Sequence, residues 1–406
     1  MKKVELLAPA GDIEILKVAF AYGADAVYIS GKRLGMRAKA KNFDLCEIEE
    51  GINHAHSLGK KVYVTINTIL RNEDFIGLEE YIKDLQKIKA DALIISDLGA
   101  VNLVKKTAPQ MEIHISTQAN SINYASVGFF KDLGAGRVIL ARELSLKEIK
   151  EISQKTKGIE LEAFVHGAMC MAYSGRCLIS NYLNNRDANR GGCSQPCRWK
   201  YALVEEKSGE VLPAYEDEDG THILNSKDLC MVTHLPKLID AGITSLKIEG
   251  RMKTSYYVGV VTKTYKEALD DYNKDPDIYN SKLDYYQEEL NKVGYRGYTT
   301  GFYNGKITEA DHNYSGNTEG RIQDFLAIVE ECKDTSGLCQ VQQRNKFKVG
   351  DTIEIFRANG PSHIQTIKKM YDENDNEIQS APHPKQKIKL YLDVPVARYD
   401  MLRLNM

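Results

Sequence analysis

Short apolar runs alternate with amphipathic stretches from the N-terminus to Glu249. The interiors of the runs are nearly continuous in apolar residues, as in Val62-Tyr63-Val64, which is typical of parallel strands covered on both faces. The alternation therefore predicts βα units around a parallel sheet. The predicted strands are residues 4–8, 26–30, 61–67, 92–97, 112–117, 137–141, 161–166 and 245–249.

Polar caps and glycines mark the ends of the helices between these runs. Asp12 is placed to cap a helix with Leu16 and Phe20 on its inner face, and Gly23 follows its end. Ser145 is placed to cap a second helix. Eight strands favour an α/β fold of the TIM-like (β/α)8 barrel type. The alternative is an open doubly wound sheet, which usually has fewer strands and a change in strand order.

The interval between the seventh and eighth runs is far longer than the others and predicts an insertion over residues 168–240. In a barrel, this insertion leaves the C-terminal end of a strand, the face where barrel enzymes place their chemistry. From about residue 320 the pattern changes to short alternating strands. We therefore predict a barrel-type catalytic domain over residues 1–318 and a small C-terminal β-barrel domain over residues 319–406.

Charge and hydropathy narrow the classes of partner. The 406 residues include 54 Lys and Arg against 56 Asp and Glu, so any basic patch that binds nucleic acid has to be local. No apolar stretch approaches the roughly 18–20 residues that span a bilayer. The N-terminus also lacks the apolar core of a signal peptide. A cytoplasmic protein with no membrane partner is the simplest interpretation.

Eight cysteines are present, and five of them lie between residues 170 and 230. A reducing compartment disfavours disulfides. We expect Cys46 to be a small buried hydrophobic residue, and Cys332 and Cys339 to be either incidental or functional. The clustered five follow the pattern C-x6-C-x15-C-x3-C-x32-C: Cys170, Cys177, Cys193, Cys197 and Cys230.

The spacing of the clustered cysteines suggests a metal centre. Structural zinc sites usually contain C-x2-C pairs, and none occurs here. Iron–sulfur clusters also use four thiolates but accept more varied spacing, which favours a [4Fe–4S] cluster. Zinc, or buried or redox-active cysteines, are the alternatives. Five candidates exceed four ligands, and a turn can present only one thiol of a C-x3-C pair inward.

The same region is basic and aromatic. Guanidinium groups bind phosphates and aromatic rings stack on splayed bases, a combination that indicates single-stranded or loop RNA. The alternative is a solvated loop whose tryptophan packs against the barrel. The candidate substrate-binding residues here are Tyr173, Arg176, Arg186, Arg190, Arg198 and Trp199, with Tyr182, Lys200 and Tyr201 nearby.

Polar residues at the predicted strand ends are candidates for the pocket, because barrel strands end there. His166 is an acid–base candidate, a substrate donor or a structural histidine. Glu249 presents a carboxylate close to Arg251, although a simple ion pair is as plausible. Arg142 can bind a carboxylate or phosphate, with surface solvation as the alternative. The catalytic candidates are His166, Glu249, Arg142 and Asn67, and the further binding candidates are Arg251 and Gln118.

Several segments resemble the collagenase-like peptidases of peptidase family U32. The motifs are HGAMCMAYSGRC at residues 166–177 and NRGGCSQPCRW at residues 189–199. Similar segments are LAPAG at 7–11, KIEGR at 247–251 and TTGFY at 299–303. The resemblance covers nearly the whole chain.

The resemblance is strongest to members that hydroxylate tRNA. It implies a tRNA uridine hydroxylase that makes 5-hydroxyuridine at the wobble position and draws on prephenate instead of molecular oxygen. It also implies a [4Fe–4S] cluster at the barrel mouth on Cys170, Cys177, Cys193 and Cys230, with Cys197 as the alternative ligand. The implied partners are the tRNA anticodon loop, a small-molecule carboxylate and iron–sulfur assembly proteins.

Two other functions stay open at this stage. The family name implies a collagenase-like, metal-dependent peptidase, but no G-x-S-x-G, H-E-x-x-H or P-loop motif occurs in the sequence. The second alternative is a non-catalytic RNA-binding module in which the cluster is structural.

Overall fold

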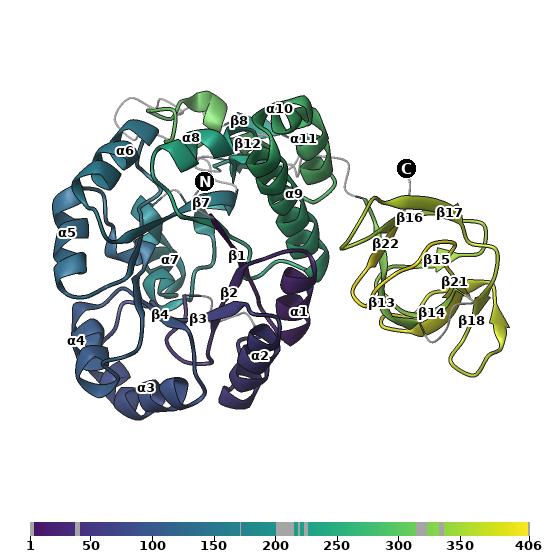
Figure 1. Cartoon of the computed structure of the whole chain (residues 1–406), viewed down its shortest axis with the longest axis horizontal. Coiled ribbons are helices and arrows are strands. Elements are labelled where there is room, and N and C mark those ends of the chain that lie inside the picture. The colour runs from purple at the N-terminus through teal and green to yellow at the C-terminus, as the bar shows by residue number, and fades with distance from the viewer. Residues whose placement is uncertain are drawn as a thin grey trace.

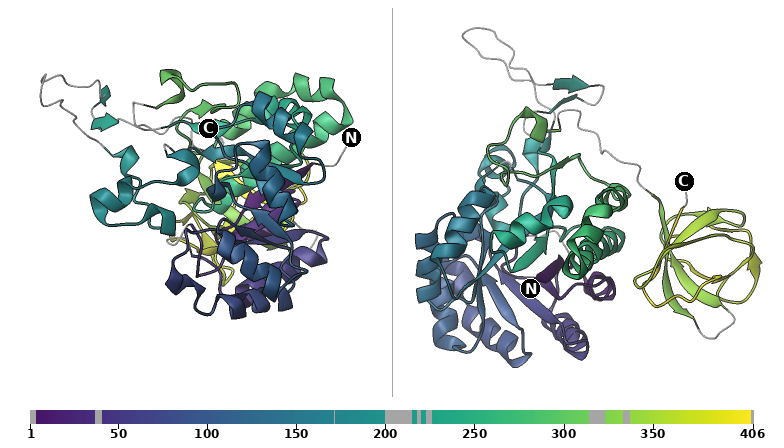
Figure 2. Two further views of the ribbon diagram at one scale, coloured as in Figure 1. Left: turned by 90° about the vertical axis from the view of Figure 1, so that its left-hand side faces the viewer. Right: turned by 45° about the horizontal axis from the view of Figure 1, so that its top comes forward.

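The computed structural model describes residues 4–36, 41–170, 172–199, 215–217, 220–222, 226–313, 323–332 and 337–404. Figure 1 and Figure 2 show a barrel surrounded by helices, with a domain of strands beside it. In the described part of the chain, no helix combines the length and apolar character needed to cross a membrane.

The predicted TIM-like barrel is confirmed. Eight parallel strands follow one another around it in sequence order, and β11 closes it by pairing with both β1 and β7. The strands are β1 (Glu5–Pro9), β2 (Ala26–Ser30), β3 (Lys61–Ile66), β4 (Ala92–Ile95), β5 (Ile113–Ile115), β6 (Arg137–Ile139), β7 (Glu160–Ala168) and β11 (Ser245–Ile248).

Helices cover the outside of the barrel, and their caps are those that the sequence predicts. The Asp12 carboxylate accepts a hydrogen bond from the Ile15 amide (2.9 Å), and Ser145 forms a capping box with Glu148. The helices are α1 (Ile13–Ala21), α2 (Leu45–Ser57), α3 (Leu78–Lys87), α4 (Leu98–Thr107), α5 (Tyr124–Asp132), α6 (Leu146–Lys155), α8 (Leu235–Asp240), α9 (Ser255–Lys274), α10 (Pro276–Ser281) and α11 (Leu283–Asn291).

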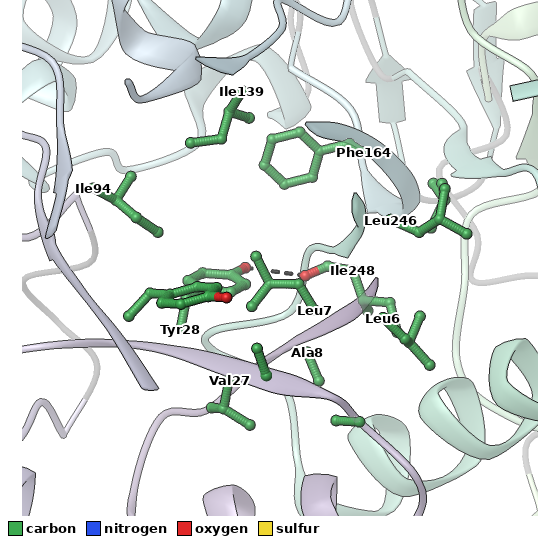
Figure 3. Close-up of a cluster of buried hydrophobic side chains, with 14 of the residues drawn as sticks. Leu6, Leu7, Ala8, Val27, Tyr28, Ile94, Ile139, Phe164, Leu246 and Ile248 are labelled. Carbon is green, nitrogen blue, oxygen red and sulfur yellow. Dashed lines mark hydrogen bonds between the residues drawn. The ribbon is translucent and has the colours of Figure 1, made fainter. Parts of the chain in front are cut away.

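The apolar runs form the core. Figure 3 shows Leu7, Ile94, Ile139 and Phe164 converging from different strands around Tyr28. Each fully buried aliphatic side chain contributes roughly 1.5–3 kcal/mol. The strands are therefore held by side chains on both of their faces, as their continuous apolar sequence predicts.

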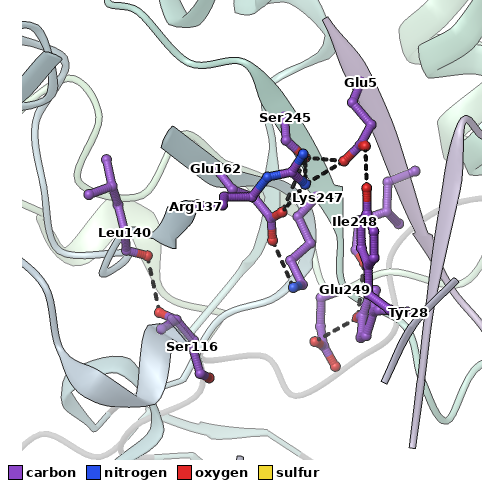
Figure 4. A network of polar contacts seen from close by, with 12 residues as sticks. Glu5, Tyr28, Ser116, Arg137, Leu140, Glu162, Ser245, Lys247, Ile248 and Glu249 are labelled. Carbon is purple, nitrogen blue, oxygen red and sulfur yellow. Dashed lines mark hydrogen bonds and ion pairs between the residues drawn. The ribbon is translucent and has the colours of Figure 1, made fainter. Parts of the chain in front are cut away.

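Charged residues also lie inside the barrel, at its N-terminal end (Figure 4). Arg137 Nη1 lies 2.5 Å from Glu5 Oε1 and 3.0 Å from Glu162 Oε2, and Arg137 also binds Glu160. Lys247 Nζ donates to Glu162 Oε1 at 2.8 Å. Because both Arg137 and Glu162 are buried, this network replaces hydration with ion pairs. The apolar pattern did not predict it.

The predicted insertion leaves the end of β7. The last residues of β7 pair antiparallel with β10 (Asp228–Cys230), which pairs parallel with β12 (Tyr298–Thr299). Within the insertion lie α7 (Ile179–Asn184) and the hairpin of β8 (Tyr215–Asp217) and β9 (Gly220–His222). Helix α8 packs beside α6 as a barrel helix, although the predicted span of 168–240 includes it.

The C-terminal domain is a curled antiparallel sheet with the order β17-β16-β22-β13-β14-β21-β18-β19. Gln365 ties the two ends of the curl together, since its side chain donates to the Tyr391 carbonyl (2.9 Å) and accepts from the Asp393 amide (2.8 Å). The predicted boundary at residues 318 and 319 lies outside the described residues. The strands are β13 (Phe325–Cys332), β14 (Leu338–Gln343), β15 (Phe347–Lys348), β16 (Thr352–Phe356), β17 (His363–Thr366), β18 (Met370–Tyr371), β19 (Glu377–Ile378), β20 (Ser380–Ala381), β21 (Lys387–Tyr391) and β22 (Met401–Leu404).

Two expectations about isolated cysteines are wrong. Cys332 and Cys339 form a disulfide, because the register of β13 and β14 places them directly opposite each other. Cys46 is exposed, because the inner face of α2 is made by Ile48 and Ile52.

The two domains share buried contacts. Arg403 of β22 is fully buried and lies 2.6 Å from Glu354 of β16 and 3.0 Å from Glu289 of α11. Tyr22, at the end of α1, stacks on Phe356 with 5.5 Å between ring centroids and donates to its carbonyl (2.9 Å). The C-terminal domain is therefore bound to the barrel by both charge and aromatic packing.

Candidate active site at the barrel mouth

A cavity of about 570 Å³, partly open to solvent, lies at the C-terminal ends of the barrel strands; we call it the barrel cavity. The structure brings together there five residues that the sequence singles out: Asn67, Gln118, Arg142, Glu249 and Arg251. The other lining residues are Tyr28, Ser30, Met36, Thr65, Ile94, Ser116, Thr117, Phe164 and Lys247.

Arg142 is held in a fixed orientation in this cavity. Its guanidinium lies 3.8 Å from the centroid of the Phe164 ring, a cation–π contact, and Nη1 donates to the Ala168 carbonyl at 2.8 Å. Nη2 lies 3.8 Å from Glu249 Oε2. Arg142 Nε is buried without a hydrogen-bond partner among the described residues. Arg142 therefore presents an oriented positive charge, and its Nε–H group remains available as a hydrogen-bond donor.

The remaining charges make the barrel cavity positive. Arg251 is buried and donates to Asn42 Oδ1 at 2.6 Å. Lys247 lies 4.4 Å above the Tyr28 ring, and Tyr28 Oη donates to the Ile248 carbonyl at 3.1 Å (Figure 4). Because Lys247 is paired with Glu162, two guanidinium groups, Arg142 and Arg251, face one carboxylate, Glu249. This excess of positive charge favours an anionic ligand.

Amide groups complete the lining. Gln118 Oε1 is buried without a hydrogen-bond partner among the described residues, so it can accept one from a ligand. The Gln118 backbone carbonyl accepts from Arg176 Nε and Nη2 at 3.0 and 2.8 Å. Asn67 Oδ1 accepts from the Met36 amide at 3.3 Å and so holds the loop after β2 in place.

His166 lines neither this cavity nor the one described further below. It is buried among the rings of Tyr257, Tyr265 and Tyr298, with Nδ1 3.4 Å from Tyr265 Oη. Burial, together with the charge of Lys253, lowers the pKa of His166 to about 3. The imidazole is therefore neutral, and the geometry supports a structural histidine instead of the predicted acid–base group.

Electrostatic interactions connect four of the five clustered thiols. Burial raises the pKa of Cys197, and the nearby charge of Arg198 lowers it. A further rise comes from three thiols that therefore lie within electrostatic range of Cys197: Cys170, Cys193 and Cys177. Among the described residues, no three His, Cys, Asp or Glu side chains are already arranged around a point that could hold one metal ion. The thiols fit a cluster in donor type and location.

Cys230 has a different environment from the insertion thiols. It lies on β10 opposite His166, and Tyr265 Oη is 3.9 Å from its sulfur. Burial raises the pKa of Cys230 to about 11. Cys230 therefore shares its surroundings with His166 and Tyr265.

The arginines of the insertion divide into those that anchor it to the barrel and those that do not. Arg190 makes two bonds to Asp74, at 2.5 and 3.0 Å, and Arg176 donates to the Gln118 carbonyl, so both fasten the insertion to the barrel. Arg198 donates to Gln195 at 3.1 Å, while the Arg186 side chain makes no ion pair with described residues.

The aromatic rings of the insertion face solvent. Tyr182 is 88%, Tyr173 48% and Trp199 41% exposed, which disagrees with the alternative of a tryptophan packed on the barrel. Lys200 and Tyr201 lie outside the described residues. Exposed rings beside guanidinium groups suit stacking on nucleic-acid bases.

Sequence reasoning missed Lys247, Tyr28 and the hydroxyl groups of the barrel cavity. Lys247 lies inside an apolar run, and a charge at such a position is itself a signal of a pocket or a buried pair. The hydroxyl residues are single positions at strand ends, and spacing alone does not separate them from surface residues.

Comparison with known proteins places this architecture in one family. The sequence profile of peptidase family U32 matches residues 11–313, and that of the peptidase family U32 C-terminal domain matches residues 321–403.

Relatives carry two kinds of name. A protein named tRNA hydroxylation protein P1 in Bacillus subtilis is 41% identical over 99% of this chain and 95% of its own length. A protein of Escherichia coli named 23S rRNA 5-hydroxycytidine C2501 synthase is 42% identical over 66% of this chain and 39% of its own length. A protein of Porphyromonas gingivalis named collagenase is 35% identical over 93% of this chain and 91% of its own length.

Proposed function

Because this chain belongs to peptidase family U32, we propose that it is an RNA-modifying enzyme that hydroxylates the wobble uridine of tRNA to 5-hydroxyuridine. The observation that carries the proposal is the similarity to a tRNA hydroxylation protein along 99% of the chain. The exposed rings and guanidinium groups of the insertion support RNA as the substrate, since they suit an anticodon loop.

We propose prephenate as the co-substrate and the barrel cavity as its site. Prephenate carries two carboxylates, and the cavity offers the guanidinium groups of Arg142 and Arg251. The Phe164 face offers apolar contact to its ring. Either Glu249 or Gln118 Oε1 can accept the one hydrogen bond that its hydroxyl group donates. These residues would bind and orient the acid.

We further propose that the insertion holds a [4Fe–4S] cluster on Cys170, Cys177, Cys193 and Cys230, with Cys197 as the alternative ligand. When bound, such a cluster supplies electron-transfer or Lewis-acid chemistry. The protein fixes the polypeptide around it: the Asn189 side chain accepts from the Cys177 amide (3.1 Å) and donates to the Cys177 carbonyl (3.0 Å). Arg190 joins the same segment to the barrel through Asp74.

Mass spectrometry of tRNA nucleosides tests the function. Cells that lack the gene are expected to lose nucleosides derived from 5-hydroxyuridine, and the wild-type gene is expected to restore them. Arg142→Met is expected not to restore them, whereas Lys150→Met, which removes an exposed charge from α6, is expected to do so. Unchanged nucleosides in the deletion strain would refute the proposal.

A collagenase-like peptidase is the second candidate, favoured by the name of the Porphyromonas gingivalis relative. The purified, iron-replete protein is expected to leave gelatin intact under conditions in which a collagenase control degrades it. Cleavage by the wild type and not by Arg142→Met would favour the peptidase instead. A non-catalytic RNA-binding module would bind tRNA without ever yielding the modified nucleoside.

A further inference from the structure

A second cavity of about 780 Å³ lies next to the barrel cavity, and we call it the cysteine cavity because Cys170 lines it. The consecutive residues Arg142 and Glu143 separate the two, since Arg142 lines the first and Glu143 the second.

Aromatic and apolar side chains form much of the wall of the cysteine cavity. Phe302 and Ile307 come from the segment after β12, Met169 from the end of β7, and Tyr173 from the insertion. The ring of Tyr173 is also 48% exposed, so it reaches from the cavity wall to the solvent. Flat apolar walls with an aromatic ring at the surface suit a planar ring that enters from outside.

The Phe302 side of this wall is fixed by hydrogen bonds. Tyr303 Oη donates to the Phe164 carbonyl at 2.6 Å, and the Tyr303 carbonyl accepts from the Leu146 amide at 3.0 Å. Gly301 has φ +56, and a Cβ there would lie 3.3 Å from Met169 Cε. The TTGFY segment at residues 299–303 therefore forms a fixed wall of the cavity. It has a glycine at position 301, where a side chain would crowd Met169.

Charge distinguishes the two cavities. The barrel cavity is lined by Arg142, Lys247 and Arg251, whereas the described residues that line the cysteine cavity include two carboxylates, Glu143 and Asp311, and no lysine or arginine. A carboxylate ligand is therefore attracted to the first cavity and repelled by the second. A neutral planar ligand with N–H donors suits the second, since carboxylate oxygens accept such bonds.

We propose that the cysteine cavity binds a single pyrimidine base extruded from the RNA strand, while the barrel cavity holds the anionic co-substrate. This inference rests on the proposed function and assigns its two substrates to separate sites. Tyr173 and Phe302 contact the base, and Glu143 accepts a hydrogen bond from the N3–H group of a uracil.

Photo-crosslinking tests the assignment with the full-length protein. An anticodon stem–loop with 5-iodouridine at the wobble position is bound, irradiated and mapped by peptide mass spectrometry. Crosslinks to Tyr173 or Phe302 are expected. Crosslinks to Tyr28 or Phe164 would put the base in the barrel cavity and overturn the inference, while the proposed function would stand. A stem–loop that fails to bind at all would refute both, and one that binds without any crosslink to these rings would refute the inference alone.

A variant pair supplies a second readout. Tyr173→Ala is expected to weaken stem–loop binding by about tenfold, as expected for loss of one stacking contact, and to leave prephenate binding unchanged. Tyr124→Ala, which removes a similarly exposed tyrosine (44%) from α5, is the matched control and is expected to change neither. Saturating prephenate is expected to leave the crosslink in place. Competition between the two ligands, or equal loss of both in Tyr173→Ala, would show one shared site.

Discussion

At the scale of single residues, the cysteines show where spacing stops being informative. The sequence identifies the group of five but cannot say which thiols face one another, because a residue's direction depends on the turn that carries it. In the structure Cys170, Cys177 and Cys193 lie within electrostatic range of Cys197, whereas Cys230 is buried on β10. Both ligand sets, with Cys230 or with Cys197, stay predictions.

We expect Cys230→Ser to lose its iron while Cys197→Ser keeps it, as the resemblance implies. The reverse result would establish Cys197 as the fourth ligand. The measurement is iron and acid-labile sulfide per chain after anaerobic purification, with circular dichroism to confirm folding. Cys46→Ser, which changes an exposed cysteine on α2, is the matched control and is expected to bind iron as the wild type does.

His114 provides a prediction about pH. Burial, followed by the charges of Arg137 and Lys247, lowers its pKa well below the usual 6.5. The unfolded chain therefore binds this proton near pH 6.5 while the folded chain does not, so stability falls as the pH drops below about 6.5. The measurement is the free energy of unfolding in urea at pH 7.0 and 5.5. Between these two pH values it is expected to fall less in His114→Gln than in the wild type, by up to about 1.4 kcal/mol per pH unit. Exposed His383→Gln is the control and is expected to match the wild type.

At the scale of elements, periodicity predicted the barrel well because each strand is buried on both faces and each helix has a readable cap. It did not predict β10 and β12, which are too short to show a period and exist because they pair with the extended end of β7. It also missed the buried charges of the barrel, since the partners of each charge come from different strands.

The buried network predicts a large effect for Arg137→Met. Its loss leaves Glu5 and Glu162 facing each other with Lys247 as the remaining cation. Removing one partner of a buried ion pair typically costs about 3–5 kcal/mol, so the free energy of unfolding in urea is expected to fall by that amount.

An exposed ion pair on the barrel surface provides the comparison. Lys155→Met removes the partner of Glu151 on α6 and is expected to cost less than about 1 kcal/mol. Equal effects of Arg137→Met and Lys155→Met would show that burial of the network is unimportant.

The candidate site was predictable to the extent that it depends on barrel topology. Because strand ends meet at one face, Asn67, Arg142 and Glu249 were expected together, and the structure brings them together. The roles of Arg176 and Arg190 were not predictable, since the carbonyl and carboxylate that bind them come from distant segments. The division into two cavities depends on side-chain directions that no sequence pattern encodes.

At the scale of the whole molecule, the buried contacts of Arg403 predict that the two domains unfold together. Arg403 joins Glu354 of its own domain to Glu289 of the barrel. Calorimetry of the wild type is expected to show one transition, and Arg403→Met is expected to lower it and separate it into two. Arg398→Met, which changes another C-terminal arginine, is the control. Two transitions in the wild type would contradict the coupling.

The closure of the curled sheet by Gln365 has a consequence for solubility. An open strand edge exposes backbone groups that can pair with another chain and start aggregation. Gln365 occupies backbone groups at Tyr391 and Asp393 with an amide side chain, so these two groups beside the end of β21 are satisfied from within the same molecule and are not open to a strand of another chain.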